Sequence, residues 1–247
     1  FLKREKMSKY FINYHIIPMV SAIWSMPPYE AKQMPLKFFL KFFQNHGLFS
    51  LKNRPQWYTI KNRSRTYVKK ILETISGEYY KNYRINKISR FSNGVRVYYG
   101  GNNEYFDYDK VVIATHADEA LSLITDPTEE EKSVLTNFKY KHNIAIIHTD
   151  ESLMPKNKKT WSSWNSSINK DNTSETSITY WLNLLQNLQT NKNIFLSLNP
   201  FLKIDQKKII SKIGFTHPYY DKEALQNQNR LKNIQNKKNL LFCGSYF

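Results

Sequence analysis

The sequence predicts a mixed α/β protein in which a nucleotide-binding core is interrupted by a second domain with an antiparallel sheet and helices. Residues 110–121, KVVIATHADEAL, are predicted to form a buried strand that passes directly into a helix. At the carboxyl end of a parallel strand, such a junction is where α/β proteins bind nucleotides. Helices and strands elsewhere do not alternate regularly, so a simple repeated βαβ fold is excluded.

The composition is that of a folded chain without disulfides. Hydrophobic residues make up 40% and aromatic residues 15% of the 247 residues, which is enough for a sizeable core. Cys243 is the single cysteine, so an internal disulfide framework and a cysteine-rich zinc site are excluded. One cysteine is typical of a reducing compartment, and we expect a cytoplasmic protein. No apolar run approaches the roughly 20 residues of a membrane span.

The net charge of +17 at pH 7 raises the question of an acidic partner. The lysines occur singly and in pairs among many asparagines, without a long basic block, which indicates compositional bias. No nucleic-acid-binding motif accompanies them, so we expect no nucleic-acid partner. No metal is expected either. His142 and His148 share one face of a predicted strand, but no third ligand stands at a suitable spacing.

Helices are predicted in the first third of the chain. Apolar residues at helical spacing predict a first helix that ends at Pro18. A second helix begins at Pro35 and ends at Gly47, and its polar stripe is so narrow that it is either buried on most sides or covers an apolar cavity. A third, at 65–76, follows the N-cap Ser64 and ends before Gly77. It is predicted to face the core with Val68, Ile71, Leu72 and Ile75.

Strands dominate the remainder. Residues 84–91 and 95–99 are predicted to pair around a turn at Asn93–Gly94. Residues 104–114 lead into the nucleotide-binding strand, and the helix at 117–124 follows. Thr128 and Glu131 form a capping box for a helix through about 138. Further strands are expected at 141–149, 176–184 and 193–199. A loop at 156–176, a helix at 221–235 and a final strand at 239–245 complete the pattern.

Several short strings, in order along nearly the whole chain, resemble one protein family. They include FFQNHGL, SRTYVKKI, VVIATHADEAL, HTDESLMP, WSSWN, TYWLNLLQNL and FCGSYF. Their joint order and spacing resemble the flavin-containing amine oxidoreductase superfamily, in the branch described as predicted NAD/FAD-binding proteins. The chain contains no G-x-G-x-x-G. The resemblance implies that this phosphate-binding loop precedes Phe1 and that the late flavin-binding segment continues past Phe247, so we expect an internal piece of a longer flavoprotein.

The resemblance implies a division into domains and a set of FAD contacts. Residues 51–121 and 238–247 would form a partial FAD-binding, Rossmann-like domain, and residues 1–50 and 122–237 the substrate domain. Cys243 is expected to point into the core. One departure is the segment IKNRSRTYV, where Asn62 and Arg63 replace an expected glycine-rich turn. Asn62 can still adopt a positive φ. The implied contacts are the backbone of Ile85 near adenine, Ala114 and Thr115 at a strand end, and Gly244 and Ser245 near the flavin.

The resemblance implies an FAD-dependent oxidoreductase that passes a hydride from an organic substrate to flavin. The family's association with cyclopropane-fatty-acid-synthase-like methyltransferases favours a lipid or acyl substrate, a methyltransferase partner and peripheral membrane contact. No catalytic side chain is assigned. His46 and His116 are either catalytic or helix-end residues. Two other functions stay open: a non-catalytic module without flavin, and a basic surface- or nucleic-acid-binding protein. Large aromatic residues would line a cavity or form ordinary core: Trp57, Trp161, Trp164, Tyr180 and Trp181.

Overall fold

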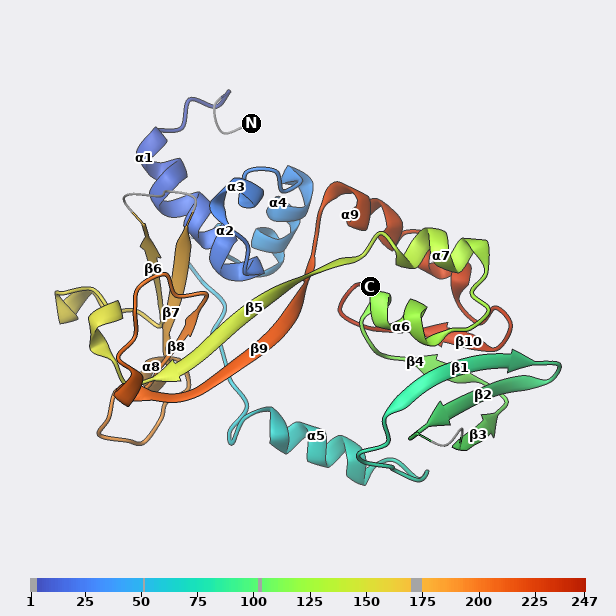
Figure 1. Cartoon of the computed structure of the whole chain (residues 1–247). Helices are drawn as coiled ribbons and strands as arrows, with labels where there is room; N and C mark the ends of the chain where they lie inside the picture. Colours follow the sequence, from blue (N-terminus) through green and yellow to red (C-terminus); the bar gives the residue numbers. More distant parts are fainter. Residues whose placement is uncertain (1–3, 51, 102–103, 170–174) are drawn as a thin grey trace. The chain divides into compact units, whose positions relative to one another are not determined.

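The computed structural model describes residues 4–50, 52–101, 104–169 and 175–247 (Figure 1). The chain divides into two compact units. Unit 1 contains Phe1–Arg54 and Tyr140–Asp221, and unit 2 contains Pro55–Lys139 and Lys222–Phe247. Helices and largely antiparallel sheets occur together, which confirms the predicted mixed class. Among the described residues, no helix combines the length and apolar character needed to cross a membrane.

Unit 1 begins with one continuous helical stretch made of α1 (Lys9–Phe11), the π-helical turn η1 (Ile12–Ile16) and α2 (Ile17–Trp24). The prediction that this helix ends at Pro18 is wrong. The Ile17 N–H donates to the Ile12 carbonyl five residues earlier, and this wider turn directly precedes the proline. A π-helical turn makes room where a proline ring would otherwise clash with the preceding turn. The stretch ends at Ser25, whose φ is 51°.

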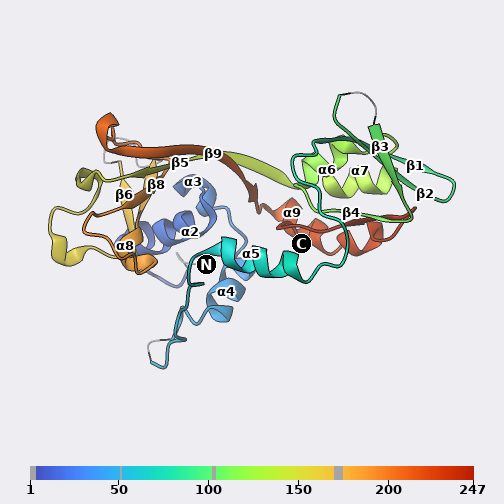
Figure 2. The same ribbon diagram turned by 90° about the horizontal axis from the view of Figure 1, so that it is seen from below.

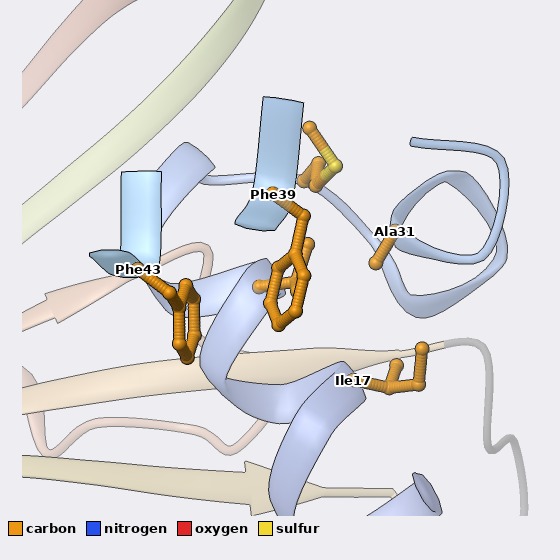
Figure 3. Close-up of a cluster of buried hydrophobic side chains, with 6 residues drawn as sticks. Ile17, Ala31, Phe39 and Phe43 are labelled. Atoms are coloured by element: carbon orange, nitrogen blue, oxygen red, sulfur yellow. The ribbon is translucent and has the colours of Figure 1, made fainter. Parts of the chain in front are cut away.

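Two further helices complete the helical part of unit 1, α3 (Pro28–Ala31) and α4 (Leu36–Asn45). The predicted bounds of α4 are confirmed, since Pro35 immediately precedes it and Gly47 follows at a φ of 63°. Phe39 and Phe43 point from α4 toward α2 (Figure 3). They form a buried cluster with four residues of the preceding helices and their connection: Ile17, Val20, Met26 and Ala31.

A five-stranded sheet in the order β6-β7-β8-β5-β9 forms the rest of unit 1. The strands are β5 (Lys139–His148), β6 (Trp164–Ile168), β7 (Thr176–Trp181), β8 (Phe195–Leu198) and β9 (Ile209–Tyr219). Figures 1 and 2 show β5 and β9 running side by side. Short helices lie between the strands: η2 (Glu151–Leu153), η3 (Lys158–Thr160), α8 (Leu182–Leu185) and η4 (Gln206–Lys208).

Two strands of this sheet were not predicted. The segment 156–176, predicted as a loop, contains β6, and β9 lies in a segment that gave no strand pattern. Both are the outer strands of the sheet. An outer strand is paired on one side and largely solvated, so it does not need the apolar alternation on which the prediction rests. The predicted strand at 176–184 also ends earlier, because Leu182 starts α8.

Unit 2 contains two small sheets. The first is an antiparallel meander of β1 (Ile85–Phe91), β2 (Gly94–Tyr99) and β3 (Glu104–Tyr108). Its first turn lies at Ser92–Asn93, one residue before the predicted position, because Gly94 already pairs with Phe91. A Cβ on Gly94 would lie 2.5 Å from the Tyr108 carbonyl oxygen, so the glycine is required for close strand approach. The second sheet pairs β4 (Val111–Ile113) with β10 (Leu240–Phe242) in parallel.

The helices of unit 2 change the expected division of the chain. Besides α5 (Ser64–Glu73), they are α6 (Ala117–Leu123), α7 (Glu129–Leu135), α9 (Lys222–Gln228) and η5 (Leu231–Ile234). The capping box at Thr128 and Glu131 is confirmed. Arg90 of β1 forms a buried ion pair with Glu131. These contacts hold residues 122–139 with the meander. Unit 2 contains Pro55–Lys139 and Lys222–Phe247, whereas the expected domain was 51–121 and 238–247.

Helix α5 (Ser64–Glu73) differs from its prediction in burial. Arg63 rather than Ser64 is its N-cap residue. The expectation that its apolar face points into the core is wrong: Val68 is 45% exposed and Ile71 55%, and the following Ile75 is 50% exposed. The helix itself was predicted correctly from the helical spacing of its apolar residues. Such spacing normally means that the apolar face is buried, but no described element covers it.

Candidate functional site

The carboxyl ends of β4 and β10 bring together four of the five predicted cofactor residues. Phe242 pairs with Ile113, and the Cys243 N–H donates to the Ile113 carbonyl at 3.0 Å. Ala114 and Thr115 follow the end of β4, and Gly244 and Ser245 come shortly after the end of β10. The two strands, which the family resemblance assigns to one domain, therefore pair within one sheet. Their shared carboxyl edge is the position where open parallel sheets bind ligands.

The residues at this edge leave the backbone accessible. Ala114, Gly244 and Ser245 are exposed, and Thr115 is half-buried with its hydroxyl donating to the His116 carbonyl. Ile85, the fifth predicted residue, belongs to the other sheet of unit 2. It lies at the start of β1, where it pairs with Tyr99 and is 37% exposed.

Gly244 is constrained by its own chain. A Cβ at this position would lie 2.7 Å from Cε1 of Tyr246 and 3.3 Å from the Thr115 carbonyl oxygen. Tyr246 is fully buried, so its ring has little freedom to move away. The expectation that Cys243 points into the core is wrong, because Cys243 is exposed. Side chains alternate along β10, and the buried positions are Leu240 and Phe242.

The turn before α5 is strained where the family resemblance implies glycine. Asn62 has a φ of 63°, as its side chain allows. Arg63 has a φ of 68° and a ψ of −174°, a region that is otherwise almost confined to glycine. The backbone therefore keeps a glycine-like course although neither residue is glycine.

The histidines have structural surroundings. His116 is the N-cap residue of α6 and shares a capping box with Glu119. His46 follows α4 and places Nδ1 2.8 Å from the Phe42 carbonyl oxygen. His142 is exposed while His148 is buried, so the two do not form a metal pair. Within the described ranges no group of three or more potential metal ligands occurs.

His148 is the centre of a buried polar network in unit 1. Its Nε2 lies 2.9 Å from Oγ of Ser197, which lies 2.7 Å from Oγ1 of Thr179. Burial lowers the pKa of the imidazole, and the nearby Asp150 carboxylate opposes this effect in part. Although burial itself raises the pKa of Asp150, hydrogen bonds from the Asp205 and Ser152 N–H groups and from Lys208 lower it to about 2. His148 is thus neutral and Asp150 ionised near neutral pH.

Unit 1 also contains an apolar cavity that sequence reasoning did not locate. Its volume is about 970 Å³, and its walls come from the stretch between Met7 and Phe39. The apolar composition of α4 had indicated either a buried helix or a helix over such a cavity. Among the large aromatic residues considered above, Trp161 packs on Trp181 and Trp164 on Tyr180, while Trp57 is 62% exposed. None of these five lines the cavity.

The mixed α/β fold is shared with several solved structures of low sequence identity. A putative protoporphyrinogen oxidase from Exiguobacterium sp. 255-15 superposes with a TM-score of 0.62 at 13% identity, over 98% of this chain and 60% of that one. Cyclohexylamine oxidase from Brevibacterium oxydans IH-35A gives a TM-score of 0.59 at 9% identity, with 97% and 59% covered.

A third solved structure is more distant. The fatty acid isomerase of P. acnes that produces CLA gives a TM-score of 0.51 at 12% identity, with 74% of this chain and 47% of that one covered. The chain therefore spans about half to three fifths of the length of these similar structures. No protein-family model and no curated protein matches the sequence.

Proposed function

We propose that the chain forms part of an FAD-dependent oxidoreductase that removes a hydride from a carbon of an organic, acyl-chain substrate. The observation that carries this proposal is the parallel pairing of β4 and β10, with small residues at their shared carboxyl edge. The fold shared with two proteins described as oxidases supports it. The family resemblance of the sequence strings supports FAD as the cofactor.

The residues present fit one edge of a dinucleotide site. Ala114, Gly244 and Ser245 expose backbone without large side chains, which lets a planar ligand approach the strand ends. When bound there, FAD would supply the hydride acceptor. The chain's own contribution is to orient the cofactor with backbone groups of unit 2 and to hold the substrate in the apolar cavity of unit 1, away from water.

We further propose that additional strands complete the sheet formed by β4 and β10. Val112, in the middle of β4, is 59% exposed, whereas parallel sheets are normally covered on both faces. A phosphate-binding loop is also required, and the 247 residues contain no G-x-G-x-x-G. Both requirements would be met by a preceding βαβ unit of the same polypeptide or of a partner.

Flavin content tests this proposal. The product of the complete coding region should purify with absorbance near ~450 nm, typical of bound flavin, and the 247-residue chain alone should retain far less. Ala114→Phe, at the carboxyl end of β4, should lower flavin content of the complete protein without unfolding it, because Ala114 is exposed. Lys110→Phe, at the exposed amino end of the same strand, is the matched control.

Each arm can contradict a different part of the proposal. Stoichiometric FAD in the chain alone would show that no completing segment is needed. Absence of flavin from the complete protein would overturn the cofactor assignment and favour a non-catalytic module. Equal flavin content in Ala114→Phe and Lys110→Phe would remove the strand ends from the site.

A further inference from the structure

The cavity in unit 1 has the size of a small-molecule site. Its volume of about 970 Å³ lies at the upper end of the roughly 300–1,000 Å³ typical of ligand pockets. Another cavity in the same unit, of about 130 Å³, is too small for an extended ligand. The large cavity is formed by residues of α1, η1, α2, α3 and α4 together with their connections.

The floor of the cavity is the hydrophobic core of the helical region. Ile17, Val20, Ala31 and Phe39 line the cavity and also belong to the buried cluster shown in Figure 3. Partly buried apolar residues extend this floor toward the opening: Ile12, Ile16, Met34 and Leu36. Such a surface matches an aliphatic chain, since it offers contacts without hydrogen-bonding groups.

The polar lining is small and carries only positive charge. Lys9, Asn13 and Lys32 are the polar members, and none of the described residues that line the cavity carries a carboxylate. Both lysines are exposed, and within the described residues neither forms an ion pair with an acidic side chain. Their ammonium groups are therefore available to an anion at the opening of the cavity, while the apolar floor faces its tail.

We infer that this cavity binds a single-chain aliphatic carboxylate, with the tail on the apolar floor and the carboxylate near Lys9 and Lys32. This inference deepens the proposed function, and it rests on that proposal only for the statement that the bound carboxylate is then oxidised. A long-chain alkylamine is disfavoured, because its ammonium would meet two lysines. A bilayer surface is disfavoured because the apolar residues line a concavity rather than an outward face.

Binding measured without flavin tests the inference on the 247-residue chain. Calorimetric titration with octanoate, decanoate and dodecanoate, below their micelle concentrations, should show affinity rising about fourfold per methylene. Lys9→Gln/Lys32→Gln should weaken dodecanoate binding about tenfold and leave the affinity for dodecanol unchanged. Lys37→Gln is the matched control, because Lys37 is exposed on α4 and does not line the cavity.

A second variant addresses the tail. Leu36→Glu places a negative charge on the apolar wall, at a half-buried position where the helix should still form, and should abolish binding of all three carboxylates. Circular dichroism checks that the variant stays folded. If Leu36→Glu is unfolded, the chain-length series and the lysine variants decide the question alone.

Three outcomes would overturn the inference: equal affinity for dodecylammonium and dodecanoate, affinity independent of chain length, or binding to anionic phospholipid vesicles without binding of monomeric dodecanoate. These outcomes are separable from failure of the proposed function. Dodecanoate binding in a protein whose complete form lacks flavin would retain the acyl site and reject the redox role. Bound flavin in the complete protein, without dodecanoate binding, would retain the redox role and reject the acyl site.

Discussion

His148 and Ser197 are joined by a fully buried hydrogen bond, 2.9 Å long, between Nε2 and Oγ. The Asp150 N–H donates to Nδ1 of the same ring at 3.1 Å, so Nε2 carries the proton and donates to Ser197. The pair ties β5 to β8 in the middle of the unit 1 sheet. It is therefore a structural feature of the HTD sequence at residues 148–150, rather than a catalytic dyad open to a ligand.

Ser197→Ala should destabilise the protein by about 1–3 kcal/mol, because it leaves the His148 Nε2–H buried without an acceptor. Urea denaturation followed by circular dichroism gives the free energy of unfolding. Ser166→Ala is the control, since Ser166 is exposed on β6, and it should change that free energy by less than ~0.5 kcal/mol. Equal values for the two variants would contradict the importance of the buried bond.

Stability should fall as pH drops below about 6.5, the ordinary pKa of histidine. Burial lowers the pKa of His148 in the folded state, so the unfolded chain takes up a proton that the folded chain refuses. The contribution is fully present above the unfolded pKa and is lost as pH falls toward the folded one. The free energy of unfolding, measured by denaturation between pH 8 and 5.5, should decrease as the pH falls. This dependence on pH should be weaker in His148→Gln and unchanged in His142→Gln.

Arg90→Met should destabilise unit 2 by about 3–5 kcal/mol, because it leaves the Glu131 carboxylate buried without its partner. The two side chains are 7% and 1% exposed. Arg90→Met/Glu131→Gln should recover part of the loss, since no uncompensated charge remains. Arg96→Met breaks the exposed pair with Asp107 and should cause a much smaller change in the denaturation midpoint. An equally large effect there would contradict the argument from burial.

Gly244→Ala should destabilise the protein by about 1–3 kcal/mol through overpacking against Tyr246. Cys243→Ser, one residue earlier, should be within about 0.5 kcal/mol of the parent because Cys243 is exposed. Thermal unfolding compares the two. Unchanged stability in Gly244→Ala, together with loss of flavin from the complete protein, would instead mean that the glycine serves the ligand and not Tyr246.

Features with a local cause could be predicted from the sequence. Thr128 and Glu131 stand at capping-box spacing, and the box forms because both its hydrogen bonds lie within one turn. Pro35 and Gly47 bound α4 for the same kind of reason. The pairing of β4 with β10 joins segments more than a hundred residues apart, and it was predictable only through the family resemblance.

Features that depend on packing could not be predicted. The spacing of Val68, Ile71 and Ile75 predicts a helix with one apolar face, but whether that face is covered depends on elements that the spacing does not describe. Cys243 was expected in the core. The buried positions of β10 are Leu240 and Phe242, and side chains alternate between the two faces of a strand, so the side chain of the next residue, Cys243, is exposed. The cavity near Lys9 and Lys32 arises only when several helices come together.

The π-helical turn Ile12–Ile16 makes one place in the cavity wall tolerant of a deletion. Such a turn holds one residue more than an α-helical turn. Removing that residue would restore α geometry and leave the flanking residues facing nearly as before, so Lys9 would stay on the same side as Val20. Removing a residue from the regular helix that follows, in α2, would instead rotate everything upstream by about 100° around the helix axis and move Lys9 away from the cavity. The same single-codon deletion thus has opposite consequences for the cavity a few residues apart.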